Sequence, residues 1–187
     1  MNAQHKITLI LGGARSGKSS HAQTLAEASG KSVTYLATAE ALDEEMSKRI
    51  QKHRAERPSQ WETLEIPHTI AAQTARIQTD VVILDCITLL ITNLMMQYVQ
   101  DDLVDEEPFL ARVHKEVDEL ALFLRERKQD WIIVSNEVGL GLVPAYQMGR
   151  VYRDAIGWAN QRLAREADTV LFMVAGIPMV VKGKERS

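Results

Sequence analysis

An eight-residue segment near the beginning of the chain constrains the fold more than any other feature of the sequence. It fits the pattern G-x-x-x-x-G-K-[ST] at every fixed position with Gly12, Gly13, Ala14, Arg15, Ser16, Gly17, Lys18 and Ser19. Glycines let the backbone curl so that successive N–H groups point at phosphate oxygens, and the positive end of a following helix adds to the attraction. An apolar run at residues 7–11 precedes this phosphate loop, and an amphipathic pattern follows it. The sequence therefore predicts a strand, a phosphate-binding loop and a helix in that order.

The chemistry of such a loop assigns roles to its last two residues. We expect the catalytic Lys18 to reach the β- and γ-phosphates, and the Ser19 hydroxyl to bind Mg²⁺. A second part of such a site is a buried strand that ends in an acid, and Val81-Val82-Ile83-Leu84-Asp85 supplies it. Asp85 would orient the Mg²⁺ through water. Together these residues predict a site for a nucleoside triphosphate.

Short β-branched runs alternate with longer helical patterns along the chain, which is typical of a parallel α/β sheet buried on both faces. Strands are predicted at residues 7–11, 32–37, 81–84, 131–135, 169–174 and 179–182. Helices are predicted at residues 19–28, 43–54, 87–98, 109–127 and 146–167, where apolar residues recur every three or four positions. The acidic segment 100–108 is predicted to be a solvated loop. The expected fold is a mostly parallel sheet flanked by helices.

Composition limits the class of protein further. A chain of 187 residues with 45% apolar residues, no repeat and no Pro/Gly-rich linker predicts a single domain over residues 1–187. The single cysteine, Cys86, excludes an intrachain disulfide framework and agrees with a reducing compartment, so we expect the cytoplasm. No apolar run has the length needed to span a membrane. The net charge of -3 gives no global attraction to nucleic acid, so we expect no nucleic-acid partner.

Several classes of nucleotide-binding protein do not fit the sequence. A switch GTPase would carry N-K-x-D and D-x-x-G, whereas Asp85 is followed by Cys86, Ile87 and Thr88. A nucleic-acid motor would need a basic strip for the phosphate backbone. In Gly139-Leu140-Gly141-Leu142-Val143-Pro144, proline replaces the third glycine of a dinucleotide-binding loop. The sequence therefore argues against these three classes and leaves the class of phosphate-loop protein open.

The dense positive patch of this acidic chain surrounds one histidine. Around His53 lie Lys48, Arg49, Lys52, Arg54 and Arg57. A neutral imidazole is a competent nucleophile toward phosphorus, and neighbouring cations favour its neutral form while they attract phosphate. From the spacing alone, an ordinary surface histidine on a solvated basic helix remains an alternative.

The motifs taken in order resemble a known family, the bifunctional adenosylcobinamide kinase and adenosylcobinamide-phosphate guanylyltransferases of cobalamin biosynthesis. The resemblance rests on the phosphate loop, Tyr35-Leu36-Ala37-Thr38-Ala39, Asp43-Glu44-Glu45-Met46, Arg49-Ile50, His53-Arg54, Arg57-Pro58, Trp61-Glu62-Thr63, Asn136-Glu137-Val138-Gly139 and Ala175-Gly176-Ile177-Pro178. It spans nearly the whole chain. It implies a P-loop NTPase fold of the RecA-like kind and a homo-oligomer, specifically a trimer.

The resemblance also implies two reactions and the residues that serve them. ATP or GTP phosphorylates adenosylcobinamide; GTP then transfers GMP through a guanylylated histidine, which His53 matches, to adenosylcobinamide phosphate. The implied nucleotide contacts are Gly12 to Ser19, Ala37, Thr38, Ala39, Arg54, Ala55, Glu56, Arg57, Glu65 and Asp85. The preferred phosphoryl donor, the corrinoid-binding residues and the tasks of Asn136 and Glu137 stay open.

The sequence leaves two other interpretations of the same phosphate loop open. One is a small-molecule kinase with a different acceptor and no histidine intermediate. The other is a nucleotide-binding regulatory ATPase, which would lack an acceptor site. Covalent labelling of the protein by GTP separates the guanylyltransferase from both.

Overall fold

A seven-stranded sheet forms the centre of the computed structural model, which describes residues 5–40, 44–55 and 57–183. In spatial order its strands are β3 (Glu62–Glu65), β2 (Val33–Ala37), β4 (Val81–Asp85), β7 (Asp130–Val134), β1 (Ile7–Gly12), β8 (Thr169–Val174) and β9 (Ile177–Lys182). The first six run parallel, and β9 returns antiparallel to β8 as a hairpin. The carboxyl ends of the six parallel strands therefore meet at one edge of the sheet.

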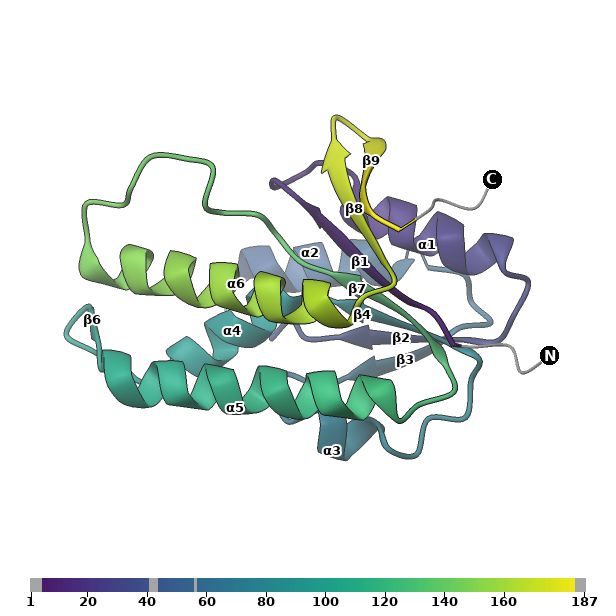
Figure 1. The fold of residues 1–187 in the computed structure, drawn as a ribbon, viewed down its shortest axis with the longest axis horizontal. Helices are drawn as coiled ribbons and strands as arrows, with labels where there is room; N and C mark the ends of the chain where they lie inside the picture. The colour runs from purple at the N-terminus through teal and green to yellow at the C-terminus, as the bar shows by residue number, and fades with distance from the viewer. Residues whose placement is uncertain (1–4, 41–43, 56, 184–187) are drawn as a thin grey trace.

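Helices cover both faces of this sheet (Figure 1). On one face lies α1 (Lys18–Ala28), whose Ala22 and Ala26 pack against Ile10 and Tyr35. The other face carries α3 (Ile70–Thr74), α4 (Ile87–Met95), α5 (Glu106–Arg125) and α6 (Gln147–Glu166). The remaining elements are α2 (Glu44–Ala55), which connects β2 to β3, and the hairpin of β5 (Val99–Gln100) and β6 (Leu103–Val104).

The local sequence explains these elements. All residues of β2 are buried, as are the first four of β4, because helices cover both faces of the sheet. In α5, Val113, Val117, Leu120 and Leu124 recur at helical spacing and are fully buried. Glu106 and Glu107 lie in the first turn of α5, where negative charge is favourable to the helix dipole.

The predicted order of strands and helices is confirmed, with shifts of a few residues at the ends. The largest shifts are at α4, which ends at Met95 and not at residue 98, and at α5, which begins at Glu106 and not at residue 109. The prediction of a solvated loop at residues 100–108 is wrong in part, since β6 and the start of α5 lie there. The sequence does not predict β3, α3, β5 or β6, because these elements are too short to show a hydrophobic period.

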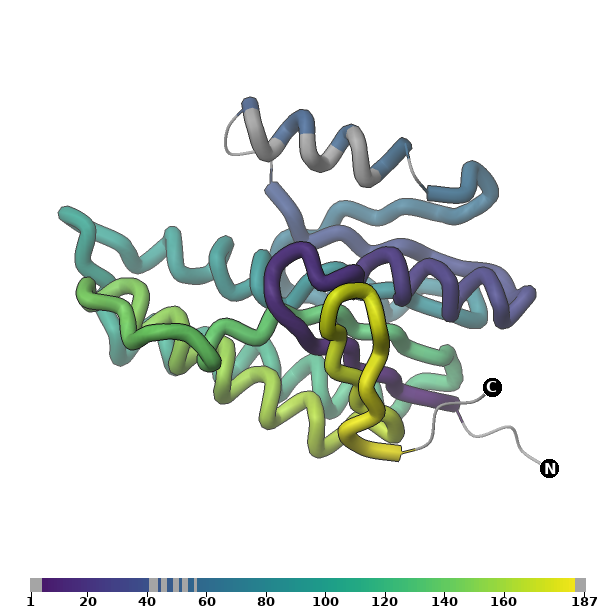
Figure 2. Tube along the Cα trace, turned by 90° about the horizontal axis from the view of Figure 1, so that it is seen from above, coloured from purple at the N-terminus to yellow at the C-terminus, as the bar shows by residue number. Residues whose placement is uncertain are grey.

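Three strands end at the same level beside one another. Ala37, the last residue of β2, is in register with Glu65 of β3 on one side and with Asp85 of β4 on the other. The turn from β1 into α1 emerges at the same edge, and Figure 2 shows it beside the β8–β9 hairpin, with α2 above the sheet on the β2–β3 side. Ligands of open α/β sheets bind at this carboxyl edge, so the functional site is expected there.

Candidate active site

Backbone geometry explains why the phosphate loop needs two of its glycines. Gly12 has φ 149° and Gly17 has φ 93°, in the region that L side chains rarely adopt. A Cβ on Gly12 would lie 2.7 Å from both the Met173 carbonyl oxygen and Ser16 Oγ. At Gly17 a Cβ would lie 3.2 Å from the Cα of Gly176, in the β8–β9 turn. The loop is thus packed tightly against the end of β8.

Lys18 lies over this loop as the first residue of α1. Its side chain is nearly buried, and Nζ donates to the Gly13 carbonyl oxygen at 2.6 Å and to Ser16 Oγ at 3.5 Å. The Gly176 N–H donates to the Ser16 carbonyl oxygen at 3.0 Å, which fixes the loop from the other side. No acidic residue occupies the first turn of α1, whose positive end therefore favours an anion. The loop has the geometry of a phosphate site.

Asp85 at the end of β4 is held by a tyrosine beneath it. The Tyr35 hydroxyl donates to Asp85 Oδ2 at 2.5 Å. Burial, and then the charge of Asp85, raise the pKa of Tyr35 well above its ordinary value, so the hydroxyl keeps its proton and remains a donor. The guanidinium carbon of Arg57 lies 3.7 Å from the centre of the Tyr35 ring, a cation–π contact. One buried ring therefore contacts both Asp85 and Arg57.

The end of β3 carries the carboxylate predicted to contact nucleotide. Glu65 is exposed there, and its Oε1 lies 3.7 Å from Arg54 Nη1 at the end of α2. Both side chains are more than half exposed, so this ion pair is weak and can open for a ligand. The pair joins two residues that the sequence analysis proposed separately.

A row of buried polar groups connects the loops that follow β2, β4 and β7. Thr38 Oγ1 donates to the Cys86 carbonyl oxygen at 2.7 Å and accepts the Cys86 N–H at 2.9 Å. The Cys86 sulfur lies 2.9 Å from Thr88 Oγ1, which accepts a hydrogen bond from Asn136 Nδ2 at 3.0 Å. Burial, and then Asp85, raise the pKa of the Cys86 thiol to about 11, so it stays neutral. These contacts are structural and leave no thiolate nucleophile at the edge.

The structure brings most of the predicted site residues to one edge of the sheet. The phosphate loop, Ala37, Thr38, Ala39, Glu65 and Asp85 lie in the loops and element ends on the carboxyl side. Arg54 and Ala55 end α2 and Arg57 follows it, and Arg54 and Arg57 reach the other residues through their contacts with Glu65 and Tyr35. His53 belongs to α2, but its side chain lies outside the described residues, as does Glu56 entirely. Of the basic residues near His53, Lys48 pairs with Glu44 of the same helix at 3.9 Å.

The sequence motifs predict no role for Tyr35 or Asn93, although both side chains contact residues of the site. Tyr35 places a hydroxyl inside an apolar strand, and Asn93 interrupts the long apolar run of residues 81–96. A polar group in an otherwise buried run must find a partner, because an unpaired one is costly. A polar residue inside an apolar run is therefore a sign of a buried hydrogen bond, but the sequence does not identify the partner of that bond.

The residues at this edge fit a magnesium ion held largely by its substrate. Within the described ranges, no cluster of three or more His, Cys, Asp or Glu side chains is arranged to hold a metal ion. Mg²⁺ keeps several waters and needs few protein ligands when phosphates supply the rest. Ser19 follows the loop lysine and the partly buried Asp85 ends β4, so a hydroxyl and a carboxylate are available.

In the part of the chain that is described, no helix is long and apolar enough to cross a bilayer.

Fold and loop together define a P-loop nucleotide-binding protein. Among solved structures, a DnaB-like replicative helicase aligns with TM-score 0.52 and 11% identity, and the alignment covers 96% of this chain and 54% of the helicase chain. A Pyrococcus horikoshii OT3 protein, PH0250, aligns with TM-score 0.53 and 9% identity, and the alignment covers 96% of this chain and 87% of the PH0250 chain. Identities this low show the fold alone, and the prediction of a P-loop fold with a mostly parallel sheet is confirmed.

Sequence comparison gives the family. Residues 8–181 match the family described as cobinamide kinase / cobinamide phosphate guanyltransferase. The chain is 45% identical over 179 residues to the bifunctional adenosylcobalamin biosynthesis protein CobP of Pseudomonas aeruginosa, covering 94% of this chain and 97% of the relative. It is 39% identical over 181 residues to the bifunctional adenosylcobalamin biosynthesis protein CobU of Escherichia coli K12, covering 94% and 99%. The chain belongs to this family.

Membership confirms the family and the pair of transferase activities that the sequence motifs implied. The protein is a bifunctional cobinamide kinase and cobinamide phosphate guanylyltransferase of adenosylcobalamin biosynthesis. The alternatives of an unrelated small-molecule kinase and of a regulatory ATPase are thereby excluded.

Proposed function

We propose that both reactions use the one phosphate loop and differ in which phosphorus atom of the nucleotide is attacked. In the first, the aminopropanol hydroxyl of adenosylcobinamide attacks the γ-phosphorus of ATP or GTP. The bond from that phosphorus to the bridging oxygen breaks, the hydroxyl proton leaves, and a nucleoside diphosphate departs. The Lys18 ammonium stabilises the charge that develops on the β- and γ-phosphates.

In the second reaction, a ring nitrogen of His53 attacks the α-phosphorus of GTP. The bond to the bridging oxygen breaks and pyrophosphate leaves, so GMP is held on the imidazole by a P–N bond. A phosphate oxygen of adenosylcobinamide phosphate then attacks the same phosphorus, the P–N bond breaks, and adenosylcobinamide-GDP forms while the histidine is regenerated. Arg54 and Arg57 are the cations that would neutralise the departing pyrophosphate.

The convergence of the proposed contacts at one edge of the sheet is the observation that supports this scheme most. Arg57 lies against Tyr35, Tyr35 holds Asp85, and Ala37 is in register with both Asp85 and Glu65. The last described turn of α2 approaches the same edge through the Arg54–Glu65 pair. A single nucleotide bound along this edge would bring its phosphates and nucleoside within reach of all these groups. When bound, Mg²⁺ would be held by Ser19 and by Asp85 through water, and would withdraw charge from the phosphates.

The proposal extends to the setting of the enzyme. We expect it in the cytoplasm and as a homo-oligomer, with a trimer implied by the resemblance, and we expect no nucleic-acid partner. The edge strand β9 supports an oligomer, because Ile177 and Val181 are 66% and 67% exposed on an edge that is otherwise open to pairing. Light scattering of the purified chain measures the oligomer directly.

Covalent labelling tests the guanylyl transfer. The protein is incubated with α-labelled GTP and Mg²⁺ and denatured, and acid-labile label on the chain is measured. We expect label on the wild type and none on His53→Ala, which should still phosphorylate adenosylcobinamide. Folded wild type that takes up no label would contradict the histidine intermediate.

Lys18→Ala separates the shared loop from the histidine. Both reactions should fall by about 100-fold or more, because the lysine serves the phosphates in each. Lys31→Ala is the matched control, since Lys31 pairs with Asp130 at 2.6 Å on the surface at the opposite edge of the sheet. That variant should keep both activities within about twofold. If His53→Ala lost both reactions with its fold intact, the separation of roles would be wrong.

A further inference from the structure

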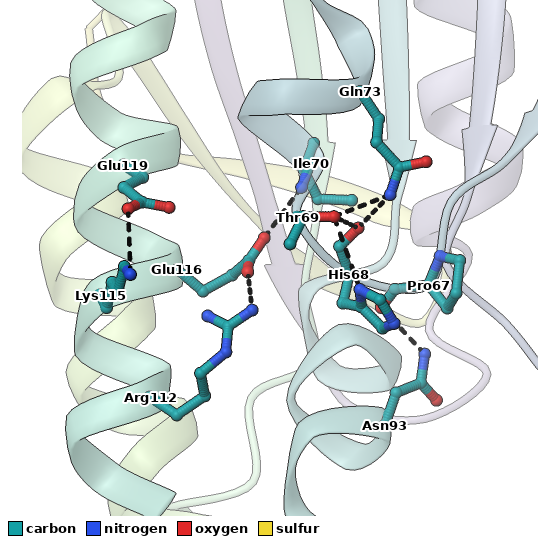
Figure 3. A network of polar contacts seen from close by, with 10 residues as sticks. All are labelled: Pro67, His68, Thr69, Ile70, Gln73, Asn93, Arg112, Lys115, Glu116 and Glu119. Atoms are coloured by element: carbon teal, nitrogen blue, oxygen red, sulfur yellow. Dashed lines mark hydrogen bonds and ion pairs between the residues drawn. The ribbon is translucent and has the colours of Figure 1, made fainter.

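A buried asparagine on α4 binds two loops of the site at once. Asn93 is 5% exposed, and its Nδ2 donates to the Thr38 carbonyl oxygen at 2.7 Å and to the Pro67 carbonyl oxygen at 3.1 Å. Thr38 follows β2 and Pro67 follows β3 by two residues. Figure 3 shows the Asn93 amide pointing at the Pro67–His68 turn.

The side-chain amide of Asn93 makes both contacts from one nitrogen atom, without bringing a charge into this buried place. An –NH₂ group carries two hydrogens, and each serves a different carbonyl oxygen. An aspartate would face the two carbonyl oxygens with a carboxylate that can donate to neither, and a leucine would leave both acceptors unpaired in a buried place. Asn93 thus ties the ends of β2 and β3 in a way that no apolar residue can replace.

The Thr38 end of this contact is fixed in turn to β4. The Thr38 N–H donates to the Asp85 carbonyl oxygen at 3.1 Å, and the Thr38 hydroxyl bonds both the N–H and the carbonyl oxygen of Cys86. The loops after three neighbouring strands are therefore joined through one threonine and one asparagine. A displacement of Asn93 would therefore displace the loops after all three strands.

The far side of the Pro67–Ile70 turn has a separate anchor, so Asn93 is the contact on the side of the site. The Ile70 N–H donates to Glu116 Oε1 of α5 at 2.9 Å, and Arg112 Nη2 lies 2.7 Å from Glu116 Oε2. Figure 3 shows this pair on the opposite side of the turn from Asn93. The Ile66 N–H is bonded to the Ala37 carbonyl oxygen at 2.9 Å and Ile70 is held by Glu116, so the Asn93 contact fixes the Pro67 carbonyl group between these two anchors.

The position of these loops in the sheet indicates which part of a nucleotide they face. The phosphate loop follows β1, whereas β2 and β3 lie three and four strands away. Neighbouring strands are about 4.8 Å apart, so the two loops lie roughly 14 and 19 Å from the phosphate loop. Phosphates bound at β1 leave the nucleoside as the part of the ligand that can reach them.

We propose that Asn93 is a positioning residue for the nucleoside of GTP, acting by holding the Thr38 and Pro67 carbonyl groups and hence the ends of β2 and β3. The inference rests on the proposed function, because that proposal places nucleotide along this edge. Asn93 itself touches no substrate in this scheme. Its loss should weaken nucleotide binding while the affinity for phosphate stays unchanged.

Equilibrium binding tests the role without catalysis. The probes are guanosine 5′-(α,β-methylene)triphosphate, which cannot transfer its GMP group, and inorganic tripolyphosphate, which has no nucleoside. For Asn93→Leu we expect the Kd of the guanosine probe to rise about tenfold and that of tripolyphosphate to change less than about twofold. In turnover, KM for GTP should rise similarly with kcat within about twofold, since a binding contact common to ground and transition state is lost.

Thr74→Val is the matched control for a simple loss of stability. Thr74 is buried in α3, next to the same turn, and its hydroxyl donates to the Ile70 carbonyl oxygen at 2.7 Å. This variant also loses one buried hydrogen bond, yet both probes should bind as they do to the wild type. If Asn93→Leu does not fold, Asn93→Ser is used, because its single hydroxyl hydrogen can serve one carbonyl at most and should give a smaller rise in the same Kd.

The outcomes separate this inference from the proposed function. An unchanged Kd for the guanosine probe in a folded Asn93 variant overturns the positioning role, and so does an equal loss of affinity for both probes or an equal effect of Thr74→Val. Absence of covalent label on the wild type contradicts the histidine intermediate instead, and leaves the binding comparison to decide the role of Asn93.

Discussion

The Tyr35 hydroxyl donates a 2.5 Å hydrogen bond to Oδ2 of Asp85, from a ring that is 1% exposed. The same ring lies under the Arg57 guanidinium, 3.7 Å from its central carbon. In the proposed scheme Asp85 serves the nucleotide phosphates, and Arg57 follows the helix that carries His53. The two proposed steps would thus share one buried support, Tyr35, which lies within the apolar sequence of β2.

Replacing Tyr35 by phenylalanine isolates the hydroxyl, because the ring under Arg57 stays. A hydrogen bond to a charged group contributes about 1.5–3 kcal/mol, and Asp85 is partly open to water that can replace the donor. We expect the free energy of unfolding of Tyr35→Phe to fall by about 1.5 kcal/mol and both transferase activities to fall about tenfold. Urea unfolding and the two separate activity assays measure these changes.

Tyr98→Phe is the control for loss of a tyrosine hydroxyl. The Tyr98 ring packs against Phe109, with ring centres 6.3 Å apart, far along the chain from the phosphate loop. Its stability should change by less than about 0.5 kcal/mol and its activities should not change. Equal effects of the two substitutions would show that the Asp85 contact has no special part in the reactions.

The contrast between Asp85 and Tyr35 explains how much of the site the sequence predicts. The phosphate loop and Asp85 are read from contiguous residues, because their chemistry requires a fixed order of types within a few positions. The partnership of Tyr35 with Asp85 joins residues 50 positions apart, and that of Asn93 with Thr38 joins residues 55 apart. Such pairs depend on strand order, which no local pattern contains.

The same reasoning applies to the fold. The buried strands and long helices have enough residues to show a period, so their order is predicted correctly. β3 has four residues, of which Glu62 and Glu65 are exposed, so it lacks both an apolar run and a strict alternation. It is a strand because it pairs with β2 along register positions such as Tyr35 with Thr63. Glu65 therefore reaches the site through a tertiary contact and not through its own sequence.

Two glycine-to-alanine substitutions should have opposite signs. Gly17 has φ 93° and its added Cβ would lie 3.2 Å from Gly176 Cα, so Gly17→Ala should destabilise the fold by about 1–2 kcal/mol. It should also weaken binding of tripolyphosphate, since the loop must shift. Gly157 lies inside α6 with open space around its missing Cβ. Gly157→Ala should stabilise the protein by about 0.5–1 kcal/mol.

Chemical denaturation of both variants beside the wild type checks the pair. Each substitution removes the same conformational freedom of a glycine from the unfolded chain, so the difference between Gly17→Ala and Gly157→Ala reports on the folded state. Gly17→Ala with wild-type stability and phosphate affinity would mean that the loop can accept a side chain. Destabilisation by Gly157→Ala would mean that the space beside α6 is filled, for instance by another subunit.

A buried carboxylate between two helices should control stability in acid. Glu166 of α6 accepts hydrogen bonds from Arg125 of α5 at 2.7 Å and from Arg162 at 2.5 Å. Burial raises the pKa of Glu166, but the two guanidinium groups outweigh it and the pKa lies below the ordinary value of 4.5. A folded-state pKa below that of the unfolded chain means that the contribution is present above pH 4.5 and is lost as the pH falls through the folded pKa.

Glu166→Gln removes this titration. The variant should be less stable than the wild type at neutral pH, because two guanidinium groups lose their charged partner, and the difference should shrink as the pH falls below the ordinary carboxyl pKa of 4.5. Urea unfolding at a series of pH values measures it. Glu119→Gln is the matched control, since Glu119 forms an exposed pair with Lys115 at 3.9 Å and should change stability by less than about 0.5 kcal/mol throughout. Parallel curves for wild type and Glu166→Gln over the acid range would contradict the assignment, because the lost stability would then come from packing and not from the charge of this carboxylate.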